Sequence, residues 1–461
     1  MAVSAADDNA PPDAGPHANS PPDGPHSAAG QPGETQSADF DGSGFRYRGD
    51  DLYAEGVALS TIAAQCGTPC YVYSRAAIET AYHHFSNALD GLQHRICYAV
   101  KANSNLAILQ VLARLGAGFD VVSGGELERV LRAGGDPHRV IFSGVGKTPT
   151  EMARALAVGI GCINIESPAE LDTLEAVAAA ADTVAAVGIR VNPDVDARTH
   201  PYISTGLREN KFGVSADQAI ALAARIRASR HLDLQGIGCH IGSQITDLAP
   251  LSEAFASVLA LAERIEQDGP PLKHLDLGGG LGVRYRDEQP IALDQYARVI
   301  KRLLANRRDL LLTFEPGRRI VAHAGVLLTR VQYLKQQGTK QFAIVDAAMN
   351  DLIRPALYQA WHSVMPVDKG AVGRRAEWDL VGPVCESGDF LARNRVLSLS
   401  AGHLLALGDA GAYGFVMSSN YNARGRAPEV LVDGARFTIV RRRETIEDAL
   451  ALEQLLPSAD T

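Results

Sequence analysis

The sequence predicts an α/β fold, a TIM (β/α)8 barrel followed by a second, mainly β C-terminal domain. From about residue 75 to 320, short apolar runs alternate with amphipathic stretches, and the eight βα units match the size and rhythm of that barrel. Beyond Arg319, strands follow one another without long helices. A chain of 461 residues also exceeds one ordinary core. A doubly wound open sheet is the alternative, but eight regular units favour closure.

Each predicted strand is a short apolar run between polar or turn-forming residues. The eight barrel strands are expected at residues 96–101, 119–122, 140–143, 162–166, 184–192, 236–240, 274–277 and 311–315. Between them, stretches such as 215–229 and 251–267 carry apolar residues at helical spacing. Strands of the second domain are expected at 326–333, 341–345, 377–381 and 430–441.

The chain is expected to divide into four parts. Residues 1–44 are rich in Pro, Ala, Gly, Ser and Asp and cannot bury enough apolar surface to offset their chain entropy, so we expect a disordered leader. Residues 45–74 are expected to join the β-domain from the N-terminal side. Residues 75–320 would form the barrel, and residues 321–461 the C-terminal β-domain.

Composition excludes several classes of function. A net charge of −9 offers no basic surface, so neither nucleic acid nor an anionic membrane is an expected partner. No uncharged apolar run is long enough to span a bilayer, and no secretory signal is visible. The six cysteines show neither a disulfide framework nor a metal-binding spacing, so we expect no metal and a reduced, cytoplasmic setting.

Lys101 is the first candidate for chemistry. It ends the first predicted barrel strand, where a lysine cannot easily reach water. Lysine amines form Schiff bases with carbonyl cofactors such as pyridoxal 5′-phosphate (PLP). A lysine that extends its ammonium to water from the strand end is the alternative, and position alone favours it. The remaining residues at the strand ends favour PLP.

Barrel enzymes place their chemistry at the C-terminal ends of the strands, with a phosphate site in the loops after strands seven and eight. Glycines there let the backbone approach an anion and direct several N–H groups at it. A glycine run alone is more often an ordinary loop, but two such turns indicate phosphate. The candidates at these strand ends are Asp120, Arg190, His240, Ser243, Gly278, Gly279, Gly280, Glu315, Gly317 and Arg318.

Glu315 is the most informative partner for Lys101. PLP withdraws electrons only while its pyridine nitrogen stays protonated, and a neighbouring carboxylate holds that proton. A structural ion pair is the alternative for Glu315. His240 would lie flat against the cofactor ring, although on its own it reads equally well as a core histidine.

Two residues of the second domain complete the candidate set. Cys385 lies beside Glu386 and Asp389 in a glycine-containing loop, and acidic neighbours suit a thiol that donates a proton better than a nucleophile. Tyr413 follows Gly411-Ala412 and supplies a phenol for phosphate or substrate. Their alternatives are a buried small hydrophobe and a packed aromatic ring.

These motifs resemble the fold-type III PLP-dependent decarboxylases over about residues 45–455. The resemblance rests on YAVKAN at 98–103, HPYISTG at 200–206, NKFG at 210–213, HIGSQ at 240–244, EPGR at 315–318, RPALY at 354–358 and CESGD at 385–389. It implies that Lys101 carries PLP and His240 stacks on it, while Gly279, Gly317 and Ser243 hold the phosphate. Cys385 would be the proton donor. The substrate-binding positions would be Arg318, Arg354, Tyr358, Glu386 and Tyr413.

The resemblance further implies a homodimer in which the Cys385–Glu386 loop reaches the partner's site. The expected reaction is decarboxylation of meso-2,6-diaminopimelate, a small amino acid, to L-lysine and CO2, the last step of lysine biosynthesis. Two arginines and one acid, Glu386, match a distal carboxylate beside a distal ammonium. Ornithine or lysine would leave the arginines without a partner.

Several rivals stay open at this point. An alanine racemase-like enzyme places an arginine near the pyridine nitrogen, and Glu315 argues against it. Decarboxylases of carboxynorspermidine, arginine, ornithine or lysine are nearer alternatives within the same fold type. A non-catalytic PLP-binding relative is much less expected, because the chain keeps both Lys101 and Cys385.

Overall fold

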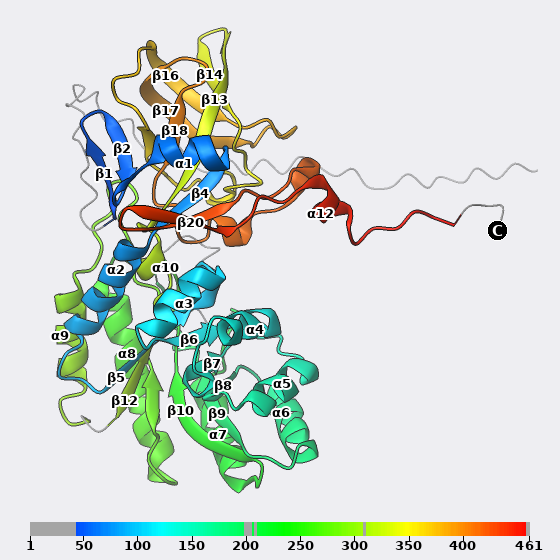
Figure 1. Ribbon diagram of the computed structural model, residues 1–461. Coiled ribbons are helices and arrows are strands. Elements are labelled where there is room, and N and C mark those ends of the chain that lie inside the picture. Colours follow the sequence, from blue (N-terminus) through cyan, green and yellow to red (C-terminus); the bar gives the residue numbers. More distant parts are fainter. Residues whose placement is uncertain (1–42, 198–204, 207–209, 308–309, 458–461) are drawn as a thin grey trace, which may run out of the picture. The chain divides into compact units, whose positions relative to one another are not determined.

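The computed structural model describes residues 43–197, 205–206, 210–307 and 310–457 (Figure 1). Of the expected leader, residues 1–42 lie outside the described residues, as do residues 200–204 of the HPYISTG motif. The described residues belong to one compact unit, which contains both a barrel and a mainly β region.

The barrel prediction is confirmed, because eight parallel strands close on themselves in the order β10-β11-β12-β5-β6-β7-β8-β9. Closure occurs where the last strand pairs with the first, with Leu312 opposite His94. The strands are β5 (His94–Ala99), β6 (Gly118–Val121), β7 (Val140–Phe142), β8 (Cys162–Ile165), β9 (Ala185–Arg190), β10 (Leu232–Gly238), β11 (His274–Asp276) and β12 (Leu311–Phe314).

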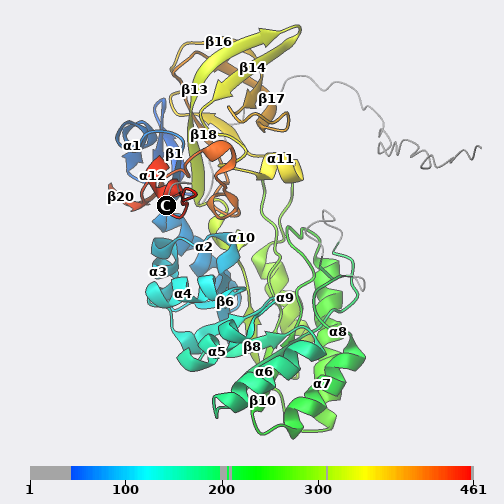
Figure 2. The same cartoon turned by 90° about the vertical axis from the view of Figure 1, so that its right-hand side faces the viewer.

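Amphipathic helices surround the barrel strands (Figure 2). Most begin at a residue whose side chain accepts a hydrogen bond from a backbone N–H of the first turn. Thr148 with Glu151, and Ser215 with Gln218, form capping boxes. The helices are α2 (Arg75–Ala88), α3 (Leu106–Arg114), α4 (Gly124–Arg132), α5 (Pro149–Val158), α6 (Pro168–Ala180), α7 (Ala216–Ala228), α8 (Leu248–Gln267), α9 (Leu293–Leu303) and the short α10 (Arg318–Val321).

The β region combines strands from both ends of the chain, in the order β17-β16-β14-β13-β4-β19-β20, while β18 pairs with β13 and β15. The N-terminal strand β4 lies between β13 and β19, with Tyr73 opposite Gly325 on one side and Leu431 on the other. The strands are β4 (Cys70–Ser74), β13 (Gly325–Gln337), β14 (Lys340–Val345), β15 (Val364–Pro366), β16 (Arg374–Val381), β17 (Phe390–Leu399), β18 (Leu404–Leu407), β19 (Glu429–Asp433) and β20 (Arg436–Arg441).

Smaller elements border this region. A three-stranded sheet precedes β4, and short helices connect or follow the later strands. They are β1 (Phe45–Arg48), β2 (Asp51–Ala54), β3 (Val57–Ala58), α1 (Leu59–Cys66), α11 (Arg354–Tyr358) and α12 (Ile446–Leu450). Within the described part of the chain, no helix has both the length and the apolar character of a membrane-spanning segment.

Two details of the strand prediction are wrong. Residues 430–441 form a hairpin of β19 and β20, because Gly434 adopts a positive φ of 59° and reverses the chain. The first barrel strand ends at Ala99, and Lys101 lies on the 3-10 turn Val100–Ala102 that follows it. This turn places the lysine at the barrel mouth.

Glu429 ties the β region to the barrel. Its buried carboxylate accepts hydrogen bonds from Tyr73 Oη at 2.8 Å, Asn105 Nδ2 at 2.9 Å and Arg441 Nε at 2.9 Å. Asn105 caps the barrel helix α3, whereas Tyr73 and Arg441 belong to β4 and β20. One carboxylate therefore joins three segments that are distant in sequence.

We expect Glu429→Gln to lower the free energy of unfolding by about 2–4 kcal/mol, because an amide cannot satisfy three donors and leaves Arg441 without its counter-ion. Urea unfolding followed by circular dichroism measures the change. Glu447→Gln, at an exposed residue of α12, is the control and should cost less than about 0.5 kcal/mol. Equal stability of the two variants would contradict the assigned role.

Candidate active site

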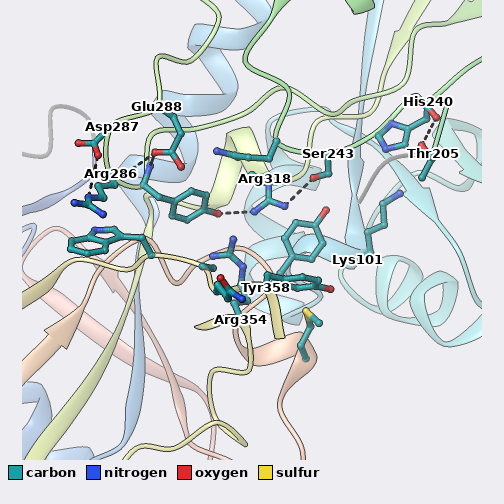
Figure 3. A pocket seen from close by; sticks show the side chains of 17 residues that line it. Lys101, Thr205, His240, Ser243, Arg286, Asp287, Glu288, Arg318, Arg354 and Tyr358 are labelled. Atoms are coloured by element: carbon teal, nitrogen blue, oxygen red, sulfur yellow. Dashed lines mark hydrogen bonds and ion pairs between the residues drawn. The ribbon is translucent and has the colours of Figure 1, made fainter. Parts of the chain in front are cut away.

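A cavity of about 510 Å³ lies at the C-terminal ends of the barrel strands (Figure 3). Lys101, His240 and Arg318 line it from the barrel, and Arg354, Tyr358 and Tyr413 line it from the β region. A second, narrower pocket shares Lys101, His240 and Ser243 with it. That pocket adds the candidate phosphate-binding and ring-binding residues, which are Gly278, Gly279, Gly280, Glu315 and Gly317.

Lys101 is held by a buried acid. Its Nζ donates to Asp120 Oδ2 at 2.8 Å, and the Asp120 side chain, on β6, is fully buried. Burial by itself lowers the pKa of Lys101, but Asp120 and Glu315 outweigh it, so the pKa lies above its ordinary value. The amine is therefore a fixed, protonated group that faces the cavity.

Glu315, directly after β12, is one of two interacting acids. Burial, followed by repulsion from Asp120 and Asp276, raises the pKa of Glu315 well above its ordinary value. Burial also raises the pKa of Asp276, at the end of β11, and each of the two carboxyls influences the pKa of the other, so we infer that they titrate together. Within the described part of the molecule, Glu315 Oε1 has no hydrogen-bond partner of its own.

This arrangement fits the pyridine ring of PLP. A buried carboxyl oxygen that lacks a partner calls for a donor, and a protonated ring nitrogen is a donor that also carries positive charge. The positive charge of the ring nitrogen would also offset part of the negative charge of the acids near Lys101. The site therefore suits PLP by its electrostatics.

The glycines form a backbone cradle next to this acid. A Cβ at Gly279 would lie 2.2 Å from the carbonyl oxygen of Glu315, and a Cβ at Gly317 would lie 2.9 Å from Ala102 Cβ. Gly278 and Gly280 adopt positive φ values of 63° and 95°. Only glycine fits such close approaches and conformations, which leave backbone N–H groups accessible to a phosphate.

His240 is a neutral ring at the same strand ends. Gly279 N donates to His240 Nδ1 at 3.2 Å, so this nitrogen is the acceptor and the ring hydrogen belongs on Nε2. Burial, and then the charges of Lys101 and Arg190, hold the pKa of His240 well below its ordinary value. An uncharged, flat ring suits stacking on an aromatic cofactor.

Not every predicted site residue lies at the cavity. Arg190, at the end of β9, binds Glu166 Oε1 at 3.3 Å and covers the ring of Phe212, and it lines neither pocket. Cys385 and Glu386 are exposed on the loop between β16 and β17 and line neither pocket of their own chain. The loop is anchored because Asp389 accepts hydrogen bonds from the amides of Met349 and Val384.

Sequence reasoning missed other residues of the site. Tyr285, Arg286, Asp287 and Glu288 line the cavity after β11, and Trp361 lines it from the loop that follows α11. The first group lies in the loop that continues from the glycine run, and this position was the available signal. Nothing local in the sequence marks the second.

Comparisons with known proteins agree with this geometry. The profile described as "Pyridoxal-dependent decarboxylase, pyridoxal binding domain" matches residues 75–322. Diaminopimelate decarboxylase from Pseudomonas aeruginosa is 62% identical over 414 residues, 90% of this chain and 99% of that protein. The Vibrio cholerae enzyme of that name is 55% identical over 90% of this chain and 99% of its own length.

A solved structure shows the same similarity. The crystal structure of diaminopimelate decarboxylase from Helicobacter pylori complexed with L-lysine is 42% identical to this chain. It superposes with a TM-score of 0.82 and covers 86% of this chain and 98% of its own.

We expect Gly279→Ala to weaken PLP binding at least about tenfold, since the new Cβ would meet the Glu315 carbonyl oxygen and displace the cradle backbone. Titration of apo-protein with PLP, followed by visible absorbance, measures the affinity. Gly146→Ala is the matched control, because a Cβ there would meet no atom within 4 Å. Retention of wild-type affinity by Gly279→Ala would argue against a phosphate site at these glycines.

Proposed function

The chain belongs to the pyridoxal-dependent decarboxylases, among the diaminopimelate decarboxylases, and from this we propose how its own residues carry out the reaction. The enzyme is PLP-dependent and converts meso-2,6-diaminopimelate to L-lysine and CO2, the last step of lysine biosynthesis. One observation of geometry carries the substrate assignment. Two buried arginines, Arg318 and Arg354, share a cavity with the amine of Lys101.

Bound PLP supplies an electron sink for the pair that remains when the carboxylate leaves. Lys101 would hold the cofactor through its Nζ, and Asp120 Oδ2, 2.8 Å away, is the acceptor for the proton that this amine must lose. Glu315 Oε1 would accept the hydrogen bond from the ring nitrogen and keep its proton in place. His240 would cover one ring face, while Gly278, Gly279, Gly280, Gly317 and Ser243 hold the phosphate.

The arginines would select the substrate. Arg318 and Arg354 would bind the distal carboxylate with charge-assisted hydrogen bonds, and Tyr358 and Tyr413 would border the same chain. Glu386 would bind the distal ammonium. Ornithine and lysine lack the distal carboxylate, so two buried guanidiniums would remain without an anion.

We place Cys385 and Glu386 in the partner's site. Both are exposed on their loop and line neither of the two pockets described above in their own chain, which supports a homodimer with shared sites. Cys385 Sγ would donate the proton that replaces CO2 on the substrate carbon. All six cysteines are free thiols, and a reducing, cytoplasmic setting is proposed on that basis.

Purified enzyme should release CO2 from meso-diaminopimelate with a kcat/KM at least about 100-fold higher than from lysine, ornithine, arginine or carboxynorspermidine. Buried arginines left without an anion cause the discrimination. A coupled assay of CO2 across these substrates measures it, and Lys101→Ala provides the background rate. Faster release from any competitor would refute the assignment.

Mixing Lys101→Ala with Cys385→Ala protein should restore about one quarter of wild-type activity after subunit exchange. Half of the dimers would be mixed, and each mixed dimer would contain one site with both native residues. The measurement compares CO2 release before and after exchange, with each variant alone as the control. If both residues act within one chain, no activity will return.

A further inference from the structure

The two substrate-binding arginines are held by neutral groups. Arg318 Nη1 donates to Tyr285 Oη at 2.7 Å and its Nη2 donates to Ser243 Oγ at 2.9 Å (Figure 3). Arg354 Nη1 lies 2.9 Å from His362 Nε2. Among the described residues, neither guanidinium has a carboxylate within ion-pair distance.

His362 is a fixed, uncharged acceptor. It is fully buried, and its Nδ1 lies 2.8 Å from the carbonyl oxygen of Gly408. A carbonyl only accepts, so Nδ1 carries the hydrogen and Nε2 offers its lone pair to Arg354. Burial and the charge of Arg354 lower the pKa of His362 to about 3, so the ring stays neutral at physiological pH.

Tyr285 joins the two arginines. Its hydroxyl binds Arg318, while the Arg354 guanidinium lies 4.6 Å from the centre of the same ring. The ring also meets His362 edge-on at 5.7 Å. One phenol therefore contacts both cations and the imidazole, and sets their spacing.

Three acids near the arginine pair, in the described part of the chain, are bound to other groups. Asp409, which attracts Arg354, lies 2.5 Å from His323 Nδ1. At the cavity mouth, Asp287 pairs with Arg286 at 3.1 Å, and Glu288 accepts from the backbone amides of Tyr285 and Arg286. The positive charge of the arginine pair is thus left for a ligand.

Two like charges buried together without a counter-ion are costly. Burial, with a contribution from Arg318, lowers the pKa of Arg354. An anion placed between the guanidiniums removes this cost, so the pair is suited to a carboxylate. A protein carboxylate in place of His362 or Tyr285 would neutralise the arginines permanently and would therefore weaken binding of the ligand's carboxylate.

We propose that His362 and Tyr285 are positioning residues that set selectivity for a substrate with a distal carboxylate, because they orient Arg354 and Arg318 without neutralising them. The inference rests on the proposed function and adds two residues to it. Neither residue needs to act on the reacting carbon. Their effect should appear in substrate binding.

His362→Glu and His362→Gln provide a test with side chains of equal size. Gln retains a neutral acceptor for Arg354, whereas Glu neutralises the guanidinium. Relative to His362→Gln, we expect His362→Glu to raise KM for meso-diaminopimelate at least about tenfold, with kcat changed less than about threefold. Calorimetric Kd values for 1,5-diaminopentane, the diamine that remains when both carboxylates of diaminopimelate are removed, should differ less than about threefold between the two variants.

Tyr285→Phe provides a second test with less risk to folding. It removes the acceptor for Arg318 but keeps the ring beneath Arg354, so KM for meso-diaminopimelate should rise about three- to tenfold while the Kd for 1,5-diaminopentane stays unchanged. Gln337→Glu, at the exposed end of β13, is the charge control for the His362 variants. It replaces a glutamine by a glutamate, which is the difference between His362→Gln and His362→Glu, but far from the site. Bound-cofactor absorbance and circular dichroism show that each variant is folded.

Each result decides the proposal. A rise in KM for meso-diaminopimelate that spares binding of 1,5-diaminopentane supports it, and if His362→Glu does not fold, Tyr285→Phe alone decides. Equal KM values for the variants and their controls, or equal losses for both ligands, overturn it. Wild-type turnover of meso-diaminopimelate in the same assay separates this outcome from failure of the proposed function.

Discussion

The ion pair between Lys101 and Asp120 is the interaction on which the site depends. It joins the turn after β5 to the neighbouring strand β6 and holds a primary amine at the centre of the barrel mouth. Glu315 and Asp276 add two further buried acids, so the protein surrounds one lysine with more negative charge than it can balance. This excess of negative charge favours the binding of a cationic ring at this end of the cavity.

The β region completes the mouth that the barrel begins. Tyr413 N donates to the carbonyl oxygen of Ala102 at 2.8 Å, and Asn103 Nδ2 donates to that of Gly411 at 3.0 Å. These bonds fix a loop of the β region against the turn that carries the lysine. A second connection between the β region and the barrel is the hydrogen bond from Asn105, the N-cap of α3, to Glu429. The proposed cofactor-binding and substrate-binding residues therefore depend on the same packing of the β region against the barrel.

Local patterns in the sequence predicted much of this arrangement. The barrel strands follow from short apolar runs, and Lys101 and Glu315 could be found because strand ends converge at one edge of a barrel. Residues with roles set by distant neighbours could not be found this way. His362 lies in a stretch without a motif, and only the fold brings it to Arg354 and Gly408. Arg190 pairs with Glu166 and does not reach the cavity. The hairpin at 430–441 was missed because one glycine reverses an otherwise continuous apolar pattern.

The cavity separates its charges by position. Acids lie behind Lys101 at the ring end, while Arg318 and Arg354 lie at the other end with neutral acceptors around them. Coulomb energies are large where water is excluded. A cationic ring placed near the arginines, or a carboxylate placed near the acids, would therefore be unfavourable. A ligand with a cationic ring at one end and a carboxylate at the other satisfies both ends at once. In the proposed binding mode, decarboxylation at the ring end would leave the distal carboxylate intact and bound by the arginines, so a substrate with two similar ends would lose only one carboxylate.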